Sequence, residues 1–206
     1  MTEVALGIDI GTGSTKAGLV DGDGRLVAVG RCANEVEEPR PSWSQSDPQS
    51  WVTAARSALA AALAAVGRPV EVVAVGFSGQ MHGVVLCDRS MAPIRPAVLW
   101  SDQRSQPYLG EIRPRFQPAE RARLANPIVA GMAGPTMAAL GREEPETVAR
   151  VAHILQPKDW VRHRLTGVLA TDPSDASATL LWDAVDDRWW PMACRVFDVD
   201  PGWLPP

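Results

Sequence analysis

The chain has 206 residues, of which 46% are hydrophobic and 21% are charged, proportions typical of a globular domain. These values exclude a disordered tail, a collagen-like fibre and a coiled-coil rod, and the length predicts one large domain or two small ones. The formal net charge is -4, so we expect no basic surface for nucleic acid or anionic lipid.

The cysteine pattern indicates a reducing environment. Cys32, Cys87 and Cys194 are odd in number and far apart, which fits neither a disulfide framework nor paired metal-binding knuckles. Apolar stretches are broken by Gly, Arg or Pro before they reach the roughly 20 residues of a spanning helix, and Met1–Val4 lacks the basic start of a secretory signal. We therefore expect a cytoplasmic protein with no membrane contact and no nucleic-acid partner.

The beginning of the chain predicts a three-stranded antiparallel meander. Apolar runs over 4–10, 16–20 and 25–29 indicate strands, and the last two flank the turn sequence Asp21-Gly22-Asp23-Gly24. A polar, Pro-rich loop is expected over 35–46.

A helix and a strand are expected next. Asp47 is a candidate N-cap, Pro48 suits the first helical position, and the Ala-rich run continues to Val66, where Gly67 ends the predicted helix. The β-branched run over 70–77 predicts a central strand covered on both faces, because its hydrophobicity is continuous rather than alternating.

The remaining sequence is mainly helical in pattern. Short strands are expected over 84–86 and 97–99, and few strands after them. Helices are expected over 118–124, 145–155, 158–165, 176–182 and 189–197. A meander followed by strands and crossing helices predicts an α/β domain with a mixed sheet.

The end of the first strand carries groups that suit phosphate chemistry. A carboxylate, a turn of small and hydroxyl residues and a cation follow one another there: Asp9, Gly11, Thr12, Gly13, Ser14, Thr15 and Lys16. Glycines let backbone N–H groups approach anionic oxygens, hydroxyls donate, a lysine neutralises charge and an aspartate holds hydrated Mg²⁺. The alternative is a hairpin turn in which Asp9 caps its own backbone.

A second candidate site follows the strand over 70–77. Gln80, Met81 and His82 lie between Gly79 and Gly83, and ligands collect at strand ends in open α/β sheets. An imidazole at this position suits the hydroxyl groups of a polyol or sugar. The alternative is a turn in which His82 satisfies a backbone carbonyl.

A third candidate follows the strand over 97–99. Trp100 offers a flat apolar wall, and Asp102 and Arg104 offer oriented acceptors and donors. The alternative is a packed tryptophan beside an ion pair.

Five segments in this order resemble the FGGY family of carbohydrate kinases, and the second is similar to the segment typical of its xylulokinase members. They are Gly7–Thr12, Ser78–Gly83, Pro96–Arg104, Leu155–Trp160 and Thr171–Ser177. The resemblance implies a ribonuclease H-like domain, related to actin and hexokinase, with a mixed sheet and helices on both faces.

The resemblance also implies an activity, namely ATP-dependent phosphorylation of a ketose, with D-xylulose the favoured sugar. Asp9 would hold Mg²⁺ and the transferred phosphate, and Thr12 and Lys16 would lie near the γ-phosphoryl oxygens. The sugar would contact Met81 and His82 beside Trp100, Asp102 and Arg104, and the cofactors would be ATP and Mg²⁺.

Two departures from the family pattern affect this expectation. Thr136 and Ala139 stand where family members usually carry Lys and Trp. Family kinases also continue into a second, actin-like domain that supplies the aspartate base, whereas this sequence stops at Pro206. We therefore expect residues 1–206 to form the N-terminal domain alone, with little kinase activity and with a second copy or a separate C-terminal-domain chain as partner. The alternative is a non-catalytic module that binds sugar or protein.

Overall fold

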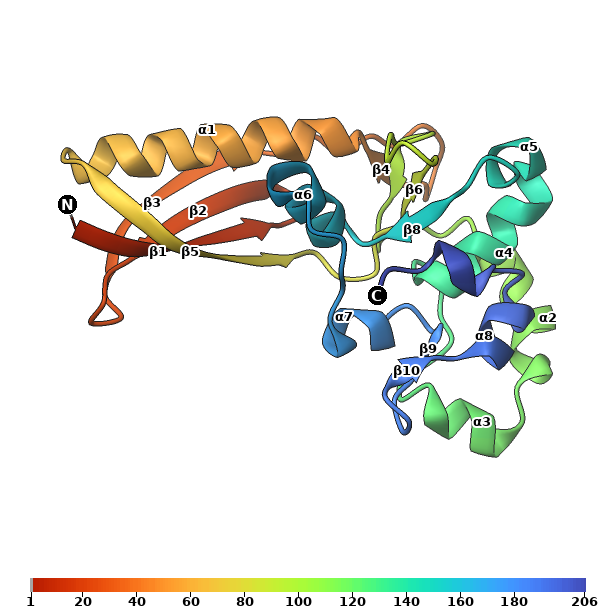
Figure 1. Cartoon of the computed structure of the whole chain (residues 1–206). Helices are drawn as coiled ribbons and strands as arrows, with labels where there is room; N and C mark the ends of the chain where they lie inside the picture. The colour runs from red at the N-terminus through yellow and green to blue at the C-terminus, as the bar shows by residue number, and fades with distance from the viewer. Residues whose placement is uncertain (1) are drawn as a thin grey trace.

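The amino-terminal part of the chain folds into a sheet with a long helix along one face (Figure 1). The structure, a computed structural model, describes residues 2–206. Strands β1 (Thr2–Ile10), β2 (Ser14–Val20) and β3 (Leu26–Ala33) form the expected antiparallel meander, and β5 (Val70–Gly79) pairs in parallel with β1. The strand order β3-β2-β1-β5 confirms the expected mixed sheet.

Helix α1 (Pro48–Val66) begins and ends where its sequence signals predict. The Asp47 carboxylate accepts a hydrogen bond from the Gln49 N–H at 3.0 Å, which satisfies one of the free donors of the first turn. Gly67 ends the helix in a left-handed conformation, with φ of 66°. The helix packs against β3 and β2.

The first hydrophobic core lies between the sheet and two helices. Alternate β1 side chains from Val4 to Ile10 are buried against Trp51 of α1 and Trp160 of α6 (Pro157–Thr166). Both helices lie on this face, and among residues 2–206 no helix covers the opposite face, where Gly7 of β1 is exposed. The expectation of helices on both faces is therefore wrong for the described part of the chain.

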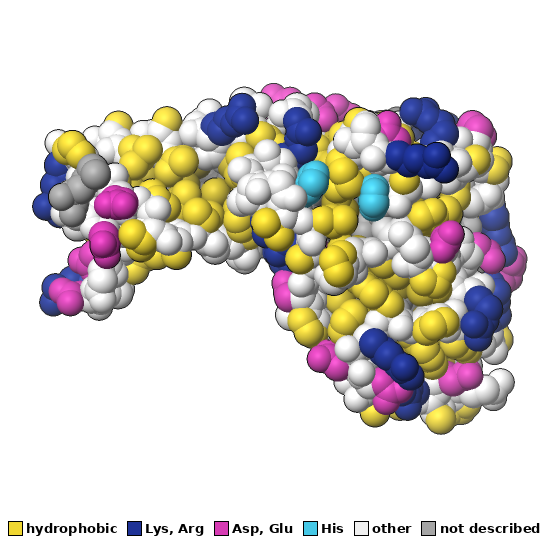
Figure 2. Space-filling model, viewed as in Figure 1, with side chains coloured by type: hydrophobic (Ala, Val, Ile, Leu, Met, Phe, Trp, Pro, Cys, Tyr) yellow, Lys and Arg dark blue, Asp and Glu magenta, His cyan; other side chains and the backbone are white. Residues whose placement is uncertain are grey.

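Strand β5 is an edge strand rather than the central strand that its sequence predicts. It pairs with β1 alone, and α1 lies over β2 and β3 instead. Val72, Val73 and Val75 are consequently 40%, 57% and 46% exposed. Figure 2 shows hydrophobic side chains gathered on the surface of the part of the molecule that contains the four-stranded sheet, on the left of the view. The continuous apolar run correctly indicates a strand, but it does not determine which neighbours cover it.

The rest of the chain packs around a second core that includes Phe116, Met137 and Phe197. Three two-stranded ladders join β4 (Gln45–Ser46) to β7 (Ala97–Val98), β6 (Val85–Cys87) to β8 (His153–Leu155), and β9 (Trp182–Asp183) to β10 (Arg188–Trp189). The described residues form six further α-helices, which are α2 (Leu109–Ile112), α3 (Pro118–Arg123), α4 (Ala133–Glu143), α5 (Pro145–Val148), α7 (Pro173–Ser177) and α8 (Pro191–Val196), together with three 3₁₀ turns.

Several predicted boundaries are wrong in this second part. The helix expected over 145–155 ends at Val148, because residues 153–155 pair with β6 instead. The helix expected over 176–182 begins earlier, because Asp172 caps α7 by accepting from the Asp175 N–H. The residue pattern alone does not indicate helix α4, since its two glycines and a proline lower its intrinsic helix propensity. No described helix is long and apolar enough to cross a membrane.

Candidate active site

A hollow of about 320 Å³ lies where β1 and β5 end side by side. Parallel strands bring their carboxyl ends to one sheet edge, which is where ligands bind in open α/β folds. The lining residues come from the β1–β2 turn, the segment after β5 and the segment after β7: Asp9, Gly11, Thr12, Gly79, Gln80, Met81 and Trp100. The structure thus brings together members of all three candidate sites.

Hydrogen bonds tie these three segments together. The Trp100 indole Nε1 donates to the Thr12 hydroxyl at 3.0 Å, and that hydroxyl donates to Gln80 Oε1 at 3.2 Å. The Gln80 N–H donates to the Ile10 carbonyl at 2.8 Å. Gln80 is buried, yet its amide Nε2 has no hydrogen-bond partner among the described residues. A buried donor without a partner is costly, and this one belongs to a residue that lines the hollow.

Asp9 and Lys16 lie opposite each other on β1 and β2. The Lys16 Nζ is 3.5 Å from Asp9 Oδ2, and the two side chains are 50% and 44% exposed. Asp9 and Lys16 together line a second hollow of about 420 Å³, which lies on the open face of the sheet between Gly18 and Gly76. Of the two residues, only Asp9 lines the first hollow. Asp9 therefore lines both hollows, and its side chain is partly exposed.

Ser14 and Thr15 do not line either hollow. Both residues are buried, and Thr15 Oγ1 donates to Asn34 Oδ1 at 3.0 Å. Asn34 Nδ2 in turn donates to the Gly11 carbonyl at 2.7 Å and so fixes the turn. The Thr15 hydroxyl is thus engaged within the fold, and contact of the Ser14 hydroxyl with phosphate stays a prediction. Sequence reasoning missed Asn34, because nothing in its neighbourhood distinguishes it from an ordinary loop residue.

The His82 imidazole lies beside this hollow rather than in its lining. Its Nδ1 is 3.0 Å from the carbonyl of Ala178, which follows α7. Because a carbonyl oxygen accepts, Nδ1 carries the proton. His82 also has a φ of 63°, a conformation that non-glycine residues seldom adopt. The backbone contact expected as the alternative for His82 is therefore present at Nδ1, and Nε2 stays available for another partner.

Asp102 and Arg104 form a buried ion pair instead of lining the hollow. Asp102 accepts from Arg104 Nε at 2.8 Å and from Arg104 Nη2 at 2.9 Å, and the side chains are 1% and 0% exposed. Asp102 also accepts from the Ser44 N–H at 2.7 Å. Neither residue lines the hollow, although the buried Arg104 Nη1 has no hydrogen-bond partner among the described residues. Their contact with substrate stays a prediction. Trp100, by contrast, is 47% exposed.

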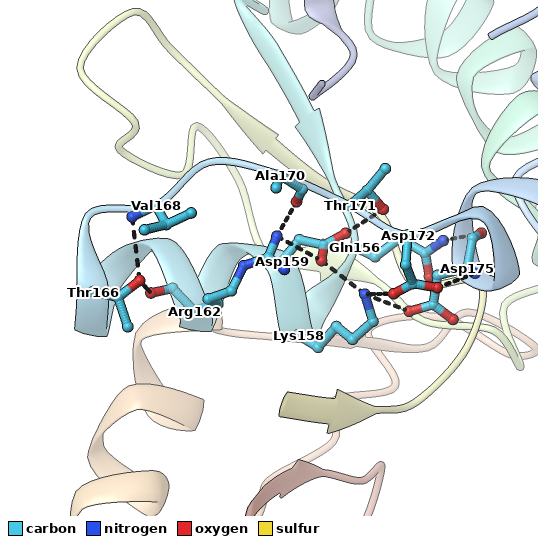
Figure 3. Close-up of polar contacts among 10 residues, drawn as sticks. All are labelled: Gln156, Lys158, Asp159, Arg162, Thr166, Val168, Ala170, Thr171, Asp172 and Asp175. Atoms are coloured by element: carbon cyan, nitrogen blue, oxygen red, sulfur yellow. Dashed lines mark hydrogen bonds and ion pairs between the residues drawn. The ribbon is translucent and has the colours of Figure 1, made fainter. Parts of the chain in front are cut away.

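A charge cluster lies at the start of α6, next to the segment over residues 79–83 that carries Gln80 and His82 (Figure 3). The buried Lys158 Nζ is 2.8 Å from Asp159 Oδ1, 2.7 Å from Asp172 Oδ2 and 3.1 Å from Asp175 Oδ2. Burial by itself lowers the pKa of Lys158, but hydrogen bonds to Asp159 and Asp172 outweigh it and raise the pKa above its usual range. Burial raises the pKa of Asp175, against the opposing charge of Lys158. Sequence reasoning gave this cluster no role.

Comparison with known proteins identifies the family. Residues 4–206 match the model of the N-terminal domain of the FGGY family of carbohydrate kinases. The chain is 34% identical to a xylulose kinase from Escherichia coli over 97% of its own length and 41% of that protein's length. It is 31% identical to a xylulose kinase from Bacillus subtilis over 98% of its own length and 40% of that protein's.

The fold agrees with this match. A crystal structure of a xylulose kinase from Rhodospirillum rubrum is 27% identical and superimposes with a TM-score of 0.94, over 98% of this chain and 42% of that one. The chain thus spans about two fifths of the length of the relatives it matches. The family match over nearly all residues and the shared ribonuclease H-like fold together show that this chain belongs to the FGGY family of carbohydrate kinases.

Proposed function

We propose that this chain provides the sugar-binding and phosphate-facing wall of an ATP-dependent ketose kinase, with D-xylulose as its preferred sugar. The observation that carries the proposal is the position of Asp9, a partly exposed residue that lines both the hollow beside Trp100 and the hollow on the open sheet face. A phosphoryl transferase needs this juxtaposition, because catalysis of the transfer consists mainly of positioning and charge neutralisation. The names of the relatives favour xylulose as the sugar.

The hollow beside Trp100 has the chemistry of a polyol site. Trp100 presents an exposed indole, a flat surface on which the C–H face of a sugar packs. The unpartnered Gln80 Nε2 offers a donor to a hydroxyl oxygen, and the 56% exposed Met81 adds apolar surface at the rim. His82 would present Nε2 to a sugar hydroxyl, with its ring fixed by the Ala178 contact at Nδ1.

The residues around Asp9 fit a magnesium-bound nucleotide. Among residues 2–206 no group of three or more His, Cys, Asp or Glu side chains forms a metal cage. Mg²⁺ does not need one, because it keeps several waters and binds through one or two carboxylates together with substrate phosphates. Mg-ATP would supply the phosphoryl group and the divalent charge. Asp9 would hold the metal, Lys16 would neutralise phosphate charge, and the Gly11–Gly13 turn would allow close approach of the phosphates.

Calorimetric titration of the purified chain tests the two parts of the proposal, which are sugar binding and nucleotide binding. We expect D-xylulose to bind and Gln80→Met to weaken it about tenfold, since the variant removes both the unpartnered Nε2 and the Oε1 that accepts from Thr12. The control Gln45→Met removes an amide that bonds Glu37, outside both hollows, and should bind D-xylulose as the natural chain does. Asp9→Asn should weaken Mg-ATP binding more than D-xylulose binding, because it removes the carboxylate that would hold the metal.

A coupled assay for ADP completes the test. We expect sugar binding with little turnover from the chain alone, because only one wall of the nucleotide cleft would be present. Binding of neither D-xylulose nor Mg-ATP at millimolar concentration would contradict the proposal, and sugar binding without any nucleotide effect would favour a non-catalytic binding module.

A further inference from the structure

The segment that carries Gln80, Met81 and His82 is held from two sides. On one side, the glycines at its ends pack against the first residues of α6. A Cβ atom on Gly79 would lie 3.1 Å from the Lys158 Cβ, and a Cβ on Gly83 would lie 2.7 Å from the Pro157 Cγ. On the other side, the imidazole of His82 donates to the Ala178 carbonyl, one residue beyond α7. The orientation of His82 therefore depends on the distance between α6 and α7.

The Lys158 cluster joins these two helices. Lys158 is the second residue of α6, whereas Asp172 caps α7 and Asp175 lies in its first turn. The ammonium contacts both carboxylates, at 2.7 Å and 3.1 Å. Figure 3 shows the Lys158 side chain pointing from α6 toward these two side chains.

Two neighbours in the cluster strengthen the same connection. Thr171 Oγ1 donates to Asp159 Oδ2 at 2.8 Å, and the Gln156 amide Nε2 donates to the Asp175 carbonyl. Arg162 adds a second cation on Asp159. Lys158 is nevertheless the only described cation that contacts Asp172 or Asp175, so its removal leaves two neighbouring carboxylates facing each other without a counter-charge.

We propose that Lys158 is a positioning residue for His82: by holding α7 against α6 it fixes the Ala178 carbonyl, and with it the tautomer and ring orientation of the imidazole. Lys158 itself is 7% exposed and does not line either hollow. It acts on a ligand through His82 rather than by contact. The sugar-binding part of this inference rests on the proposed function, whereas the effect on the imidazole does not.

Nitrogen NMR of the histidine side chains tests the proposal directly. The chain has three histidines, so ¹⁵N-histidine labelling gives a sparse spectrum in which a His82→Gln variant identifies the His82 signals. In the natural chain at a pH where imidazole is neutral, we expect the proton of His82 on Nδ1. In Lys158→Met we expect a mixture that includes the Nε2-protonated tautomer, because the Ala178 carbonyl is no longer fixed.

Two further variants keep the test decisive. Asp172→Asn removes one charge of the cluster but keeps a side chain that caps helices well, so it decides the outcome if Lys158→Met does not fold. The control Arg95→Met breaks a partly buried ion pair with Glu144, 2.9 Å long, and none of the contacts described for Arg95 involves α7. We expect a changed His82 tautomer in the first two variants and natural His82 signals in the control.

The sugar measurement separates this inference from the proposed function. We expect D-xylulose binding to weaken about fivefold to tenfold in Lys158→Met and Asp172→Asn. If no form of the chain binds D-xylulose, the proposed function fails while the NMR result still decides the role of Lys158. Folded Lys158→Met or Asp172→Asn protein with natural His82 signals would overturn the proposal, as would an equal change in Arg95→Met.

Discussion

The indole of Trp100 donates its Nε1 proton to the hydroxyl of Thr12 at 3.0 Å, across 88 residues of sequence. This bond connects the turn after β1 with the segment after β7, and both residues line the hollow beside Trp100. The same hydroxyl donates to Gln80. Thr12 thus serves as both acceptor and donor in the contacts that hold the hollow together.

Removing either partner of this bond should reduce the affinity for D-xylulose strongly while it lowers the stability of the fold only slightly. We expect Trp100→Phe and Thr12→Val each to raise the dissociation constant for D-xylulose about tenfold, with less than about 1 kcal/mol lost from the free energy of unfolding. Calorimetry and urea titration measure the two quantities. The double variant should lose less affinity than the sum of the two single losses, because both substitutions remove the bond between Trp100 and Thr12. Fully additive losses would show that the bond does not couple the two residues.

The approach of Gly131 to Trp100 should be sensitive to a single methyl group. Gly131 has a φ of 81°, and a Cβ on it would lie 1.9 Å from the Trp100 carbonyl oxygen. We expect Gly131→Ala to lower the free energy of unfolding by about 2–4 kcal/mol, from backbone strain and overpacking together. The control Gly141→Ala lies in α4 with no atom within 4 Å of its Cβ. It should raise the free energy of unfolding by about 0.5–1 kcal/mol, and equal effects of the two variants would contradict this prediction.

Asp183 should make the stability of the fold depend on pH in the acid range. Its carboxylate accepts from Arg123 Nε at 2.8 Å and from the Val185 N–H at 3.0 Å. Burial by itself raises the pKa of Asp183, but these hydrogen bonds outweigh it and hold the pKa below its usual value of 3.8. A lowered pKa in the folded state gives stability that is present above pH 3.8 and is lost as the pH falls through the folded pKa.

The Asp183→Asn variant checks this dependence. Thermal unfolding should show a lower midpoint for the variant at neutral pH, and the difference from the natural chain should shrink as the pH falls below 3.8. A difference that stays constant over the whole acid range would mean that ionisation of Asp183 does not contribute.

The three cysteines should differ in reactivity. Burial raises the pKa of the Cys87 thiol to about 12 and that of Cys194 to about 11, whereas Cys32 is partly exposed. Because the thiolate is the reactive form, a thiol reagent at neutral pH should modify Cys32 quickly and the other two only after unfolding. Cys32→Ser should abolish the fast phase. A fast phase that survives this substitution would show that a buried thiol is reached in the native state.

The sequence predicted the elements whose signals are local. The Asp47 cap, the Ala-rich run and Gly67 define α1 correctly, and the turn between β2 and β3 lies where the Gly-rich tetrapeptide predicts. The helix expected over 145–155 is wrong because the pairing of β8 with β6 is a long-range contact. Local propensity carries no information about such a partner.

The candidate site likewise contains residues that local signals place correctly and residues whose long-range contacts these signals do not reveal. Asp9, Thr12, Gln80, Met81 and Trp100 meet at one hollow, as expected from residues that follow strands. Asp102 does not line this hollow, and its spacing from Arg104 suits a buried bidentate pair as well as a ligand contact. The role proposed for Lys158 could not be predicted, since its partners Asp172 and Asp175 lie 14 and 17 residues away in sequence. These partners belong to the cap and first turn of α7, and that helix begins earlier than its sequence predicts.

The strand order has a consequence for amide hydrogen exchange. Strand β1 is bonded on both sides, whereas β3 and β5 each have one free edge. Strand β2 is likewise bonded on both sides, so the amides of β1 and β2 should exchange with deuterium more slowly than the outward-pointing amides of β5, although that strand is rich in valine. The slowly exchanging backbone of the sheet thus includes the strand that carries Asp9.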